Sequence, residues 1–376
     1  MHTTDVIIIG GGLVGSAITY GLARLGARVA QLDEGDVAFR ASRGNFGLVW
    51  VQGKGYGYAP YARWSLESSR LWPGLAANLL EETGIDVQLS QRGGYHICLS
   101  DTEARARAER LQWLQDQVGK DEYPFRMLSP ADVRDNLPGL GPEVAAVSYT
   151  PMDGHCNPLK LLRALHAGNR HQGVAYIPNA PAVTIRHAAQ VFTIDTPRGR
   201  FQAPKIVIAA GLANQKLAEQ AGMFVPVRPN KGQVIITERL TLQLRCATNY
   251  VRQTDEGTIQ IGDSMEEAGY DDVVRAPVNS AIAARAIRCF PALEHVRVIR
   301  TWAALRIMTP DGFPIYHEST QCPGAYVATC HSGVTLAAQH ATTVARWIWT
   351  GEMPSHLAAF PATRFTPDTE IVPYGS

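Results

Sequence analysis

The sequence predicts an α/β fold, α+β overall, in which a Rossmann-type domain on a parallel sheet is interleaved with a second domain on an antiparallel sheet. Three observations support this prediction. A strand pattern, a glycine-rich turn and a helix pattern follow one another from Asp5. Two more short apolar runs, typical of buried parallel strands, come only after residue 200. Between them lie segments in which apolar and polar residues alternate, as in antiparallel strands.

The first elements form a βαβ unit. Residues 5–9, DVIII, are a β-branched run short enough for a buried strand. Residues 10–26, GGGLVGSAITYGLARLG, predict a turn that opens a helix, and residues 28–35, RVAQLDEG, predict the second strand. Strand, helix and strand within about 30 residues are typical of a doubly wound sheet.

The later elements alternate in character. Helical patterns occupy residues 61–121. Strand patterns occupy much of residues 225–300, with a helix pattern at 279–290 among them. The runs KIVIAAG (205–211) and AYVATC (325–330) predict two parallel strands late in the chain. Strands of one sheet are therefore dispersed along the chain. We expect the Rossmann-type, cofactor-binding domain to comprise residues 1–60, 142–220 and 301–376, and the substrate domain to comprise residues 61–141 and 221–300.

The charge balance excludes two classes of partner. Lys and Arg number 35 and Asp and Glu number 34, so the net charge is +1. Nucleic acids and anionic membranes both need a surplus of basic residues, which replaces their counterions. We therefore expect neither of them as the main partner.

The spacing of the cysteines and the lengths of the apolar segments exclude further classes of protein. The six cysteines form no CxxC pair, so we expect no metal site and no disulfide scaffold. The N-terminus carries Asp5 and no Lys or Arg ahead of its apolar run, unlike a secretion signal. No apolar stretch reaches the ~18–20 residues of a membrane span without glycine or charge. These features predict a soluble, cytoplasmic protein with no membrane span.

Gly10, Gly12 and Gly15 form a GxGxxG pattern at the first strand-to-helix turn. The first glycine allows the tight bend, the second lets a pyrophosphate approach the backbone, and the third lets the helix pack on the strand. The helix N-terminus offers N–H groups to the phosphates. Asp33 follows Gly15 by 18 residues, where a carboxylate can bind a ribose hydroxyl. An acid there disfavours a 2′-phosphate, so we expect FAD or NAD rather than NADP.

Three further stretches narrow this choice: ASRGNFGLV (41–49), WAALRIMTPDGFPI (302–315) and YVATCHSGVTLA (326–337). With the glycine pattern they resemble the D-amino-acid oxidase-like family of FAD enzymes, which includes glycine oxidases, sarcosine oxidases and D-amino-acid dehydrogenases. MDGHCNPLKLLRAL (152–165), KIVIAAGLAN (205–214) and RPNKGQ (228–233) look like further landmarks of that family, in the expected order. The resemblance covers nearly the whole chain and implies FAD as the cofactor.

The resemblance also implies which residues lie along FAD. Val183 would contact adenine through its backbone, and Ser332 to Thr335 would open a helix whose N–H groups face the flavin. The alternative there is an ordinary helix capped by Ser332. Many relatives have Gly-His-Gly where this chain has Cys330, His331 and Ser332. The expected cofactor set is Gly10, Gly12, Leu13, Val14, Gly15, Asp33, Glu34, Ser42, Asn45, Gly47, Leu48, Val183, Ala210, Gly211, Arg306, His331, Ser332, Gly333, Val334 and Thr335.

Arg306 and Tyr250 are the expected catalytic residues. Arg306, in WAALRIMTPDG, matches the family's carboxylate-binding arginine, and a guanidinium grips a carboxylate with two parallel hydrogen bonds. The alternative is an arginine paired with Asp311 in a structural turn. Tyr250, in NYVRQTDEG, is similar to a substrate-side tyrosine of glycine oxidases, with a buried core tyrosine as the alternative.

The expected substrate pocket also contains Trp50, Gln52, Lys54, Arg252 and Gln260. Trp50 and Gln52 lie one strand step apart beside the flavin motif. Gln260 stands in GTIQIGD, which resembles a strand where sarcosine oxidases carry a lysine associated with oxygen reaction. A substrate with two carboxylates needs a second cation, for which Lys54 and Arg252 are the candidates.

These residues predict FAD-dependent oxidation of the C–N bond of an amino acid or N-substituted amino acid to an imine. Hydride passes to flavin N5, and water hydrolyses the imine to a keto acid and an amine. The stretch RASRGNFGLVWVQGKG (40–55) also looks like the β subunits of heteromeric dehydrogenases acting on opines, proline or D-hydroxyproline, which implies partner subunits for electron transfer. The alternatives are a free-standing glycine, sarcosine or D-amino-acid oxidase that makes hydrogen peroxide, and a mainly structural flavoprotein subunit.

Overall fold

The computed structural model describes residues 2–35, 41–241, 244–262 and 264–371, so Arg40 and both ends of the chain lie outside it. At its centre, β2 (Val6–Ile9) pairs in parallel with β3 (Val29–Leu32) and β13 (Lys205–Ile208), and β13 pairs with β20 (Ala325–Thr329). β9 (Ala175–Ile177) and the antiparallel β19 (Ile315–Glu318) complete the order β19-β20-β13-β2-β3-β9. Dispersed strands thus form one sheet, as predicted.

Both faces of this sheet are buried, which explains its uninterrupted apolar strands. Val6 and Ile8 pack towards α1 and the C-terminal helical segment, and Ile7 and Ile9 pack towards α5 and a second sheet of order β1-β12-β11-β10. These elements are α1 (Leu13–Arg24), α5 (Asn214–Glu219), α7 (Ala337–Gln339), the π-helical η4 (His340–Val344), α8 (Ala345–Thr350), β1 (His2–Thr3), β10 (Thr184–Ala188), β11 (Val191–Thr196) and β12 (Gly199–Ala203).

The other half of the molecule holds two four-stranded sheets around a separate apolar core. One has the order β16-β17-β14-β18 and the other β15-β5-β7-β6. The strands are β5 (Gly94–Cys98), β6 (Arg126–Leu128), β7 (Ala146–Thr150), β14 (Arg228–Arg239), β15 (Ala247–Thr248), β16 (Val251–Gln253), β17 (Thr258–Gly262) and β18 (Val298–Met308), accompanied by α3 (Asp101–Val118) and α6 (Ala276–Cys289). Most of the pairing is antiparallel, which confirms the predicted fold class.

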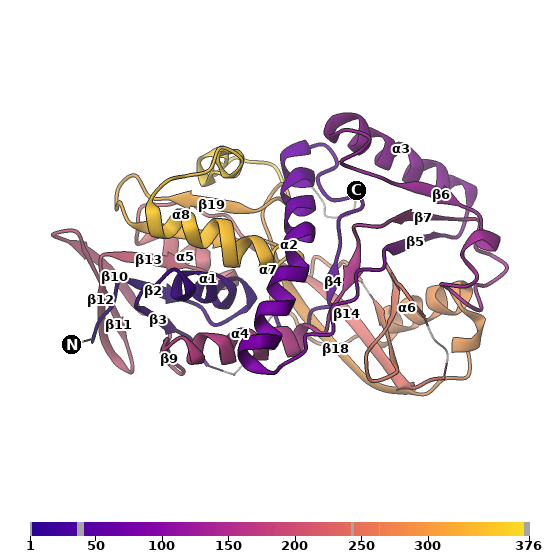
Figure 1. The fold of residues 1–376 in the computed structure, drawn as a ribbon, viewed down its shortest axis with the longest axis horizontal. Helices are drawn as coiled ribbons and strands as arrows, with labels where there is room; N and C mark the ends of the chain where they lie inside the picture. Colours follow the sequence, from indigo (N-terminus) through magenta and orange to yellow (C-terminus); the bar gives the residue numbers. More distant parts are fainter. Residues whose placement is uncertain (1, 36–40, 242–243, 263, 372–376) are drawn as a thin grey trace.

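Helix α2 (Ala59–Thr83) runs between the two halves (Figure 1). Pro60 fits its first turn, where an N–H is not needed, and Gly84 ends it with a φ of 67°. Trp64 packs on the six-stranded side and Leu66 packs against residues of α3. The remaining elements are α4 (Pro158–His171), β4 (Leu48–Val49), β8 (Gly154–His155), and the short turns η1 (Pro130–Val133), η2 (Gly211–Ala213), η3 (Pro291–Leu293), η5 (Leu357–Ala359) and η6 (Ala362–Arg364).

The sheets divide the chain differently from the expected domain boundaries at two places. Strand β7 pairs with β5 and β6, although the expected boundaries place residues 142–150 in the cofactor domain. Strand β18 pairs with β14 as far as Met308, although those boundaries place its residues after 300 there too. We propose that the boundaries follow the sheets. No described helix is long and apolar enough to cross a membrane.

Candidate functional site

The glycine-rich turn between β2 and α1 has the geometry that its three glycines predict. Gly10 has a φ of +120°, and a Cβ there would lie 2.3 Å from the carbonyl oxygen of Ala209, the residue directly after the neighbouring strand β13. A Cβ on Gly15 would lie 2.2 Å from the Gly10 carbonyl oxygen, so the third glycine lets α1 pack on the turn. Gly12 is the N-cap of α1 and has no side chain that could cap the helix itself, so a ligand can approach the helix N-terminus closely at this position.

Asp33 joins the end of β3 to this turn. Its carboxylate accepts hydrogen bonds from the Gly11 N–H at 3.1 Å and from the Tyr176 hydroxyl at 2.9 Å. Ser42 lies across the turn, where its hydroxyl accepts a hydrogen bond from the Leu13 N–H at 2.9 Å. The turn is therefore held in place from two sides before any ligand binds.

A cavity of about 610 Å³ lies against this turn. Ten of the expected cofactor residues line it: Gly10, Gly12, Leu13, Val14, Asp33, Glu34, Ser42, Val183, Ala210 and Gly211. The turn supplies backbone N–H groups and space for a pyrophosphate, and the two carboxylates suit ribose hydroxyls. Leu305, Ile307 and Cys330 add an apolar part of the wall. The lining therefore fits the adenine, ribose and pyrophosphate part of FAD, whereas Arg306 and His331 to Thr335, which are expected at the flavin end, do not line this cavity.

The segment after Ser42 lies beside the cavity. The Asn45 side chain accepts a hydrogen bond from the Gly47 N–H at 2.7 Å. Gly47 has a φ of +89°, and a Cβ there would lie 2.5 Å from the Cys156 carbonyl oxygen. Leu48 pairs with His155 in the short β4–β8 ladder. This local geometry fixes the segment against the other half of the molecule.

The expectation that Ser332 to Thr335 open a helix is corrected by the structure. Residues 333–336 form a turn closed by a 3.0 Å hydrogen bond from the Leu336 N–H to the Ser332 carbonyl oxygen, and α7 begins only at Ala337. The Ser332 hydroxyl is not a helix cap, because it is bonded to side chains from other elements.

The same turn is anchored against the cofactor side of the molecule. A Cβ on Gly333 would lie 3.7 to 3.8 Å from Val14 and Leu13, so the turn lies beside the start of α1. The Thr335 hydroxyl accepts from the Trp50 N–H at 3.1 Å, and the Val334 carbonyl accepts from the Trp72 indole at 3.2 Å.

Lys54, Tyr61 and His331 converge on the Ser332 hydroxyl. The Lys54 ammonium donates to it, the Tyr61 hydroxyl donates to it at 2.9 Å, and His331 Nδ1 lies 3.3 Å away. The ammonium also lies 5.8 Å from the centre of the Tyr61 ring. Burial lowers the pKa of Lys54 to about 8. No carboxylate of the described residues forms an ion pair with this ammonium.

Arg306 lies on β18 opposite Asn230 of β14. Its Nη1 donates to the Asn230 amide oxygen at 3.0 Å, and its guanidinium covers Gly232, where a Cβ would lie 2.2 Å from Nη2. Asp311, the partner of Arg306 in the alternative, forms an ion pair with Arg364 at 2.8 Å. Burial first, and then the charges of Lys54 and Arg306, lower the pKa of His331 well below its ordinary value. The charges of Lys54 and Arg306 thus both disfavour protonation of the His331 imidazole.

Tyr250, Trp50 and Gln52 all have close side-chain or backbone neighbours in the structure. The Tyr250 ring lies 4.3 Å from the Arg285 guanidinium and packs against the core of the second half. The contacts of Tyr250 thus match the alternative of a core tyrosine. Trp50 is 9% exposed, and its ring covers Gly94, where a Cβ would lie 2.5 Å from it. Both rings therefore have structural neighbours.

Gln52 belongs to a buried polar network rather than to an open pocket wall. Its amide donates to Asp153 at 2.7 Å and accepts from Arg107 at 2.7 Å and from Ser148 at 2.6 Å. All these partners are distant in the chain, so no local pattern predicts the network.

Arg252 and Gln260 line a second cavity of about 1030 Å³, together with Asn45. Arg252 is 3% exposed and donates to the Phe46 carbonyl oxygen at 2.5 Å. Its Nη1 lies 3.3 Å from His155 Nδ1, and burial lowers the pKa of His155 to about 3, so the neutral ring accepts this bond. The two candidate second cations, Lys54 and Arg252, thus have different surroundings.

Sequence reasoning missed Tyr61, Asn230 and Asp153. Tyr61 and Asn230 complete the surroundings of Lys54 and Arg306, and only the RPNKGQ landmark could have drawn attention to Asn230. Among the described residues no group of three or more His, Cys, Asp or Glu could hold a metal ion.

Comparisons with known proteins agree with this geometry. A family model described as "DAO: FAD dependent oxidoreductase" matches residues 5–347. An opine oxidase subunit of Agrobacterium tumefaciens (strain Ach5) is 42% identical over 97% of this chain and 98% of its own length. The corresponding opine oxidase subunit of Rhizobium meliloti is 40% identical, with the same coverage of both chains. The crystal structure of glycine oxidase from Geobacillus kaustophilus superposes with a TM-score of 0.90 at 27% identity, covering 97% of this chain and 100% of that one.

Proposed function

Because the chain belongs to the DAO family of FAD-dependent oxidoreductases, we propose that it oxidises the C–N bond of an opine-type, N-substituted amino acid. It is an FAD enzyme acting on the CH–NH group of amino-acid substrates. The product of the proposed reaction is an imine, which water hydrolyses to a keto acid and an amine.

The chemistry that FAD supplies when bound is acceptance of a hydride at flavin N5. The protein then has to bind the substrate, orient it and keep its nitrogen unprotonated. In the proposed site Arg306 binds the α-carboxylate through its two-pronged guanidinium, and Asn230 holds that guanidinium in place. Two positive charges in a partly desolvated site also lower the pKa of a substrate ammonium and favour the free amine.

One observation favours opine-type substrates. The Lys54 ammonium and His331 Nδ1 both lie at the Ser332 hydroxyl, and the charges of Lys54 and Arg306 both lower the pKa of His331, which supports two cations near one substrate. An opine carries two carboxylates, and Lys54, which lacks an ion pair among the described residues, supplies the second cation. Ser332 and Tyr61 position the Lys54 ammonium. Arg252 has the weaker claim, because it lines the second cavity, whose lining contains neither Arg306 nor Lys54.

The two opine oxidase relatives are each named as one subunit of their enzyme, which supports a partner for this chain. We propose that the chain works in a hetero-oligomer and passes electrons to a partner subunit. The likeness to glycine oxidase supports a second candidate, a free-standing oxidase of glycine, sarcosine or a D-amino acid. The candidates differ in what the purified chain does alone.

Anaerobic bleaching of the flavin separates these functions. The purified holoprotein is mixed with amino acids, N-methyl amino acids and opines, and flavin absorbance is followed. We expect bleaching by opines and, in air, little hydrogen peroxide without an added acceptor. Rapid peroxide release would support the oxidase, and unchanged absorbance with every amine would support a structural subunit.

A Lys54→Met variant tests the second cation. It should raise the half-saturating concentration of an opine at least about tenfold, as expected for loss of a charge-assisted bond. The matched control is a substrate with one carboxylate, whose half-saturation should hardly change. Equal effects on both substrates would contradict the role given to Lys54.

A further inference from the structure

The second cavity is a basic groove whose lining contains neither Arg306 nor Lys54, the two cations of the proposed substrate site. Its lining contains six basic side chains and one carboxylate, Glu256: the six are Arg43, Lys160, Arg163, Arg170, Arg252 and Arg300. The whole chain has a net charge of only +1. Positive charge is therefore concentrated at this groove.

Helix α4 supplies a basic stripe along the groove. Lys160, Arg163 and Arg170 are spaced so that all three lie on one side of the helix, because positions three, seven and ten residues apart share a helix face. Lys160 pairs with Asp255 at 2.5 Å. Arg163 and Arg170 are exposed and form no ion pair within the described part of the chain.

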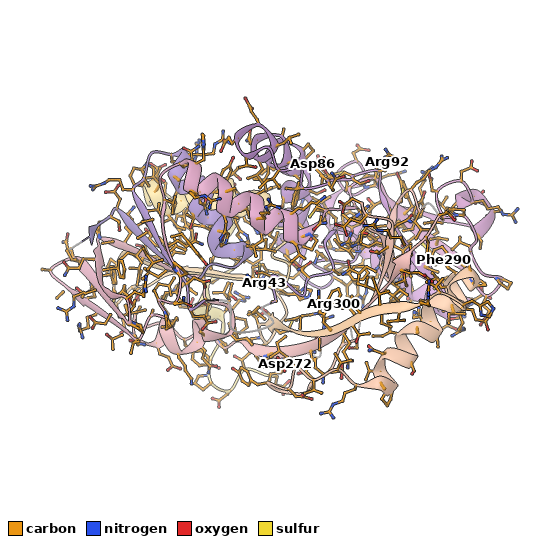
Figure 2. All side chains as sticks on the ribbon, turned by 90° about the horizontal axis from the view of Figure 1, so that it is seen from below. Arg43, Asp86, Arg92, Asp272, Phe290 and Arg300 are labelled. Carbon is orange, nitrogen blue, oxygen red and sulfur yellow. The ribbon has the colours of Figure 1, made fainter. Side chains whose placement is uncertain are left out.

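Strand β18 and the segment before β4 supply the remaining charge. Arg300 is exposed, lies 5.7 Å from the Trp302 ring and likewise has no carboxylate partner among the described residues. Figure 2 shows Arg43 and Arg300 close together in the view from below, in the middle of the molecule, and both line the groove.

Arg252 makes the groove more than a patch of surface charge. Its guanidinium is almost fully buried, yet its hydrogen bonds go to a carbonyl oxygen and a neutral imidazole rather than to a carboxylate. A buried cation without a neutralising partner is costly. An anion bound in the groove would lower that cost.

Only a thin wall separates the groove from the cofactor cavity. His166 of α4 lines the groove, and its Nε2 donates at 2.9 Å to the carbonyl oxygen of Gly11, which lines the cofactor cavity. Ser42 lines one cavity and its neighbour Arg43 lines the other. An occupant of the groove therefore comes close to the cofactor site.

We propose that the groove is the docking surface for an electron-accepting partner protein that inserts an acidic, carboxylate-rich segment. This docking proposal depends on one part of the proposed function, namely that the reduced cofactor passes its electrons to a partner subunit. Arg163, Arg170 and Arg300, which pair with no carboxylate of the described residues, attract the segment, and Arg252 receives a carboxylate at the bottom. Charge complementarity of this kind raises association rates and fixes orientation.

The test uses small acceptors of opposite charge as probes. The holoprotein is titrated to full reduction with dithionite, so no substrate is needed, and its reoxidation by ferricyanide, a trianion, or by N-methylphenazinium, a cation, is followed by stopped flow. Two ferricyanide ions accept one electron each, and the protons released from the reduced cofactor pass to water. The variant is Arg163→Glu, Arg170→Glu and Arg300→Glu combined.

We expect the variant to react with ferricyanide about tenfold or more slowly at low ionic strength, with the difference shrinking as salt is added. Its rate with N-methylphenazinium should be equal or higher. The matched control replaces three exposed arginines outside the groove, Arg92, Arg198 and Arg346, by glutamate. It changes the net charge by the same amount as the groove variant. Unchanged ferricyanide rates in the groove variant, or an equal loss in the control, would overturn the proposal.

An equilibrium measurement gives a second readout that needs no flavin reaction. A labelled hexaglutamate peptide should bind the wild-type holoprotein and the control variant but not the groove variant, as seen by fluorescence anisotropy. Pyrophosphate that binds the groove while hexaglutamate does not would assign it to a small anion and would contradict the docking of a protein segment. Neither result depends on whether an opine bleaches the flavin.

Discussion

At the scale of the residue, Arg306 shows how the facing strand can fix the orientation of a charged side chain. Asn230 binds its Nη1 at 3.0 Å, and the absence of a side chain at Gly232 leaves room for the guanidinium to lie over β14. The arginine is therefore positioned by neighbours on the facing strand, which leaves less side-chain entropy to lose when a carboxylate binds.

Arg306→Ala should weaken carboxylate substrates strongly. A hydrogen bond to a charged group contributes about 1.5–3 kcal/mol, so the half-saturating concentration should rise about 10- to 150-fold. Steady-state kinetics with an added dye acceptor measures this. Arg306→Lys keeps the charge without the two-pronged grip and should recover part of the loss. An unchanged half-saturation in the alanine variant would remove Arg306 from the site.

If Lys54 binds the second carboxylate as proposed, we expect the substrate preference to depend on pH. Its pKa is lowered to about 8, so the ammonium is charged below that pH and loses its charge as the pH rises through it. We expect the ratio of kcat/KM for an opine to kcat/KM for a one-carboxylate substrate to fall above about pH 8, because kcat/KM reports the free enzyme. Taking the ratio cancels the deprotonation of the two similar substrate amines.

The matching control is Lys54→Met, in which the ratio should be low and independent of pH. A ratio that falls equally in wild type and variant would mean that another group titrates. A flat wild-type ratio would show that Lys54 does not bind the second carboxylate.

At the scale of the element, the turn between β2 and α1 depends on a few atoms of neighbouring strands. Gly10→Ala should destabilise the protein by more than about 2 kcal/mol, because its φ of +120° is unfavourable for alanine and its Cβ would meet Ala209. The matched control is Gly26→Ala, with a φ of +87° but nothing within 4 Å of its Cβ. It should cost only about 1 kcal/mol.

Urea unfolding and the FAD-to-protein ratio measure both changes. The Gly10 variant should lose FAD as well as stability, whereas the Gly26 variant should keep its FAD. Equal losses in the two variants would contradict the importance of the contact between the turn and Ala209.

At the scale of the whole molecule, the cofactor cavity joins the two halves. Its wall combines the glycine turn with Leu305 and Ile307 of β18, which belongs to an antiparallel sheet. A ligand in this cavity therefore contacts both halves and should couple their unfolding.

Removing FAD should lower the thermal midpoint and broaden the transition. A ligand present at 100 times its Kd stabilises the native state by about 2.7 kcal/mol. Differential scanning calorimetry of the holoprotein, the apoprotein and the reconstituted protein measures this, and the Gly10→Ala variant should show no shift on adding FAD. Identical apo and holo curves for the wild type would contradict a cofactor that bridges the halves.

The accuracy of sequence reasoning depended on the range of the interactions. The parallel strands and the glycine turn were predictable, because apolar runs and the spacing of Gly10, Gly12 and Gly15 are local signals. The surroundings of Gln52 were not, because Arg107 and Ser148 come from distant elements. The residue roles that the family resemblance implies remain predictions.

Two misses had different physical causes. The family resemblance implied a helix opened by Ser332 to Thr335, with an ordinary helix capped by Ser332 as the alternative, but α7 begins at Ala337 and the Ser332 hydroxyl is bonded to Lys54 and Tyr61. The basic stripe of α4 was visible in the spacing of Lys160, Arg163 and Arg170. Its meaning was not, because only the fold places it beside Arg300 and Arg252.

The order of the strands along the chain also determines when the phosphate-binding turn can form during synthesis. Gly10 packs on Ala209, so the phosphate-binding turn is incomplete until about 200 further residues have been made. At ~5–20 residues per second, the apolar strand Val6–Ile9 waits roughly 10–40 s for β13. During that interval the nascent chain exposes an unpaired strand edge, and its FAD-binding turn is incomplete. We therefore expect FAD to bind late, after β13 has been made, so that FAD cannot protect the nascent chain during that interval.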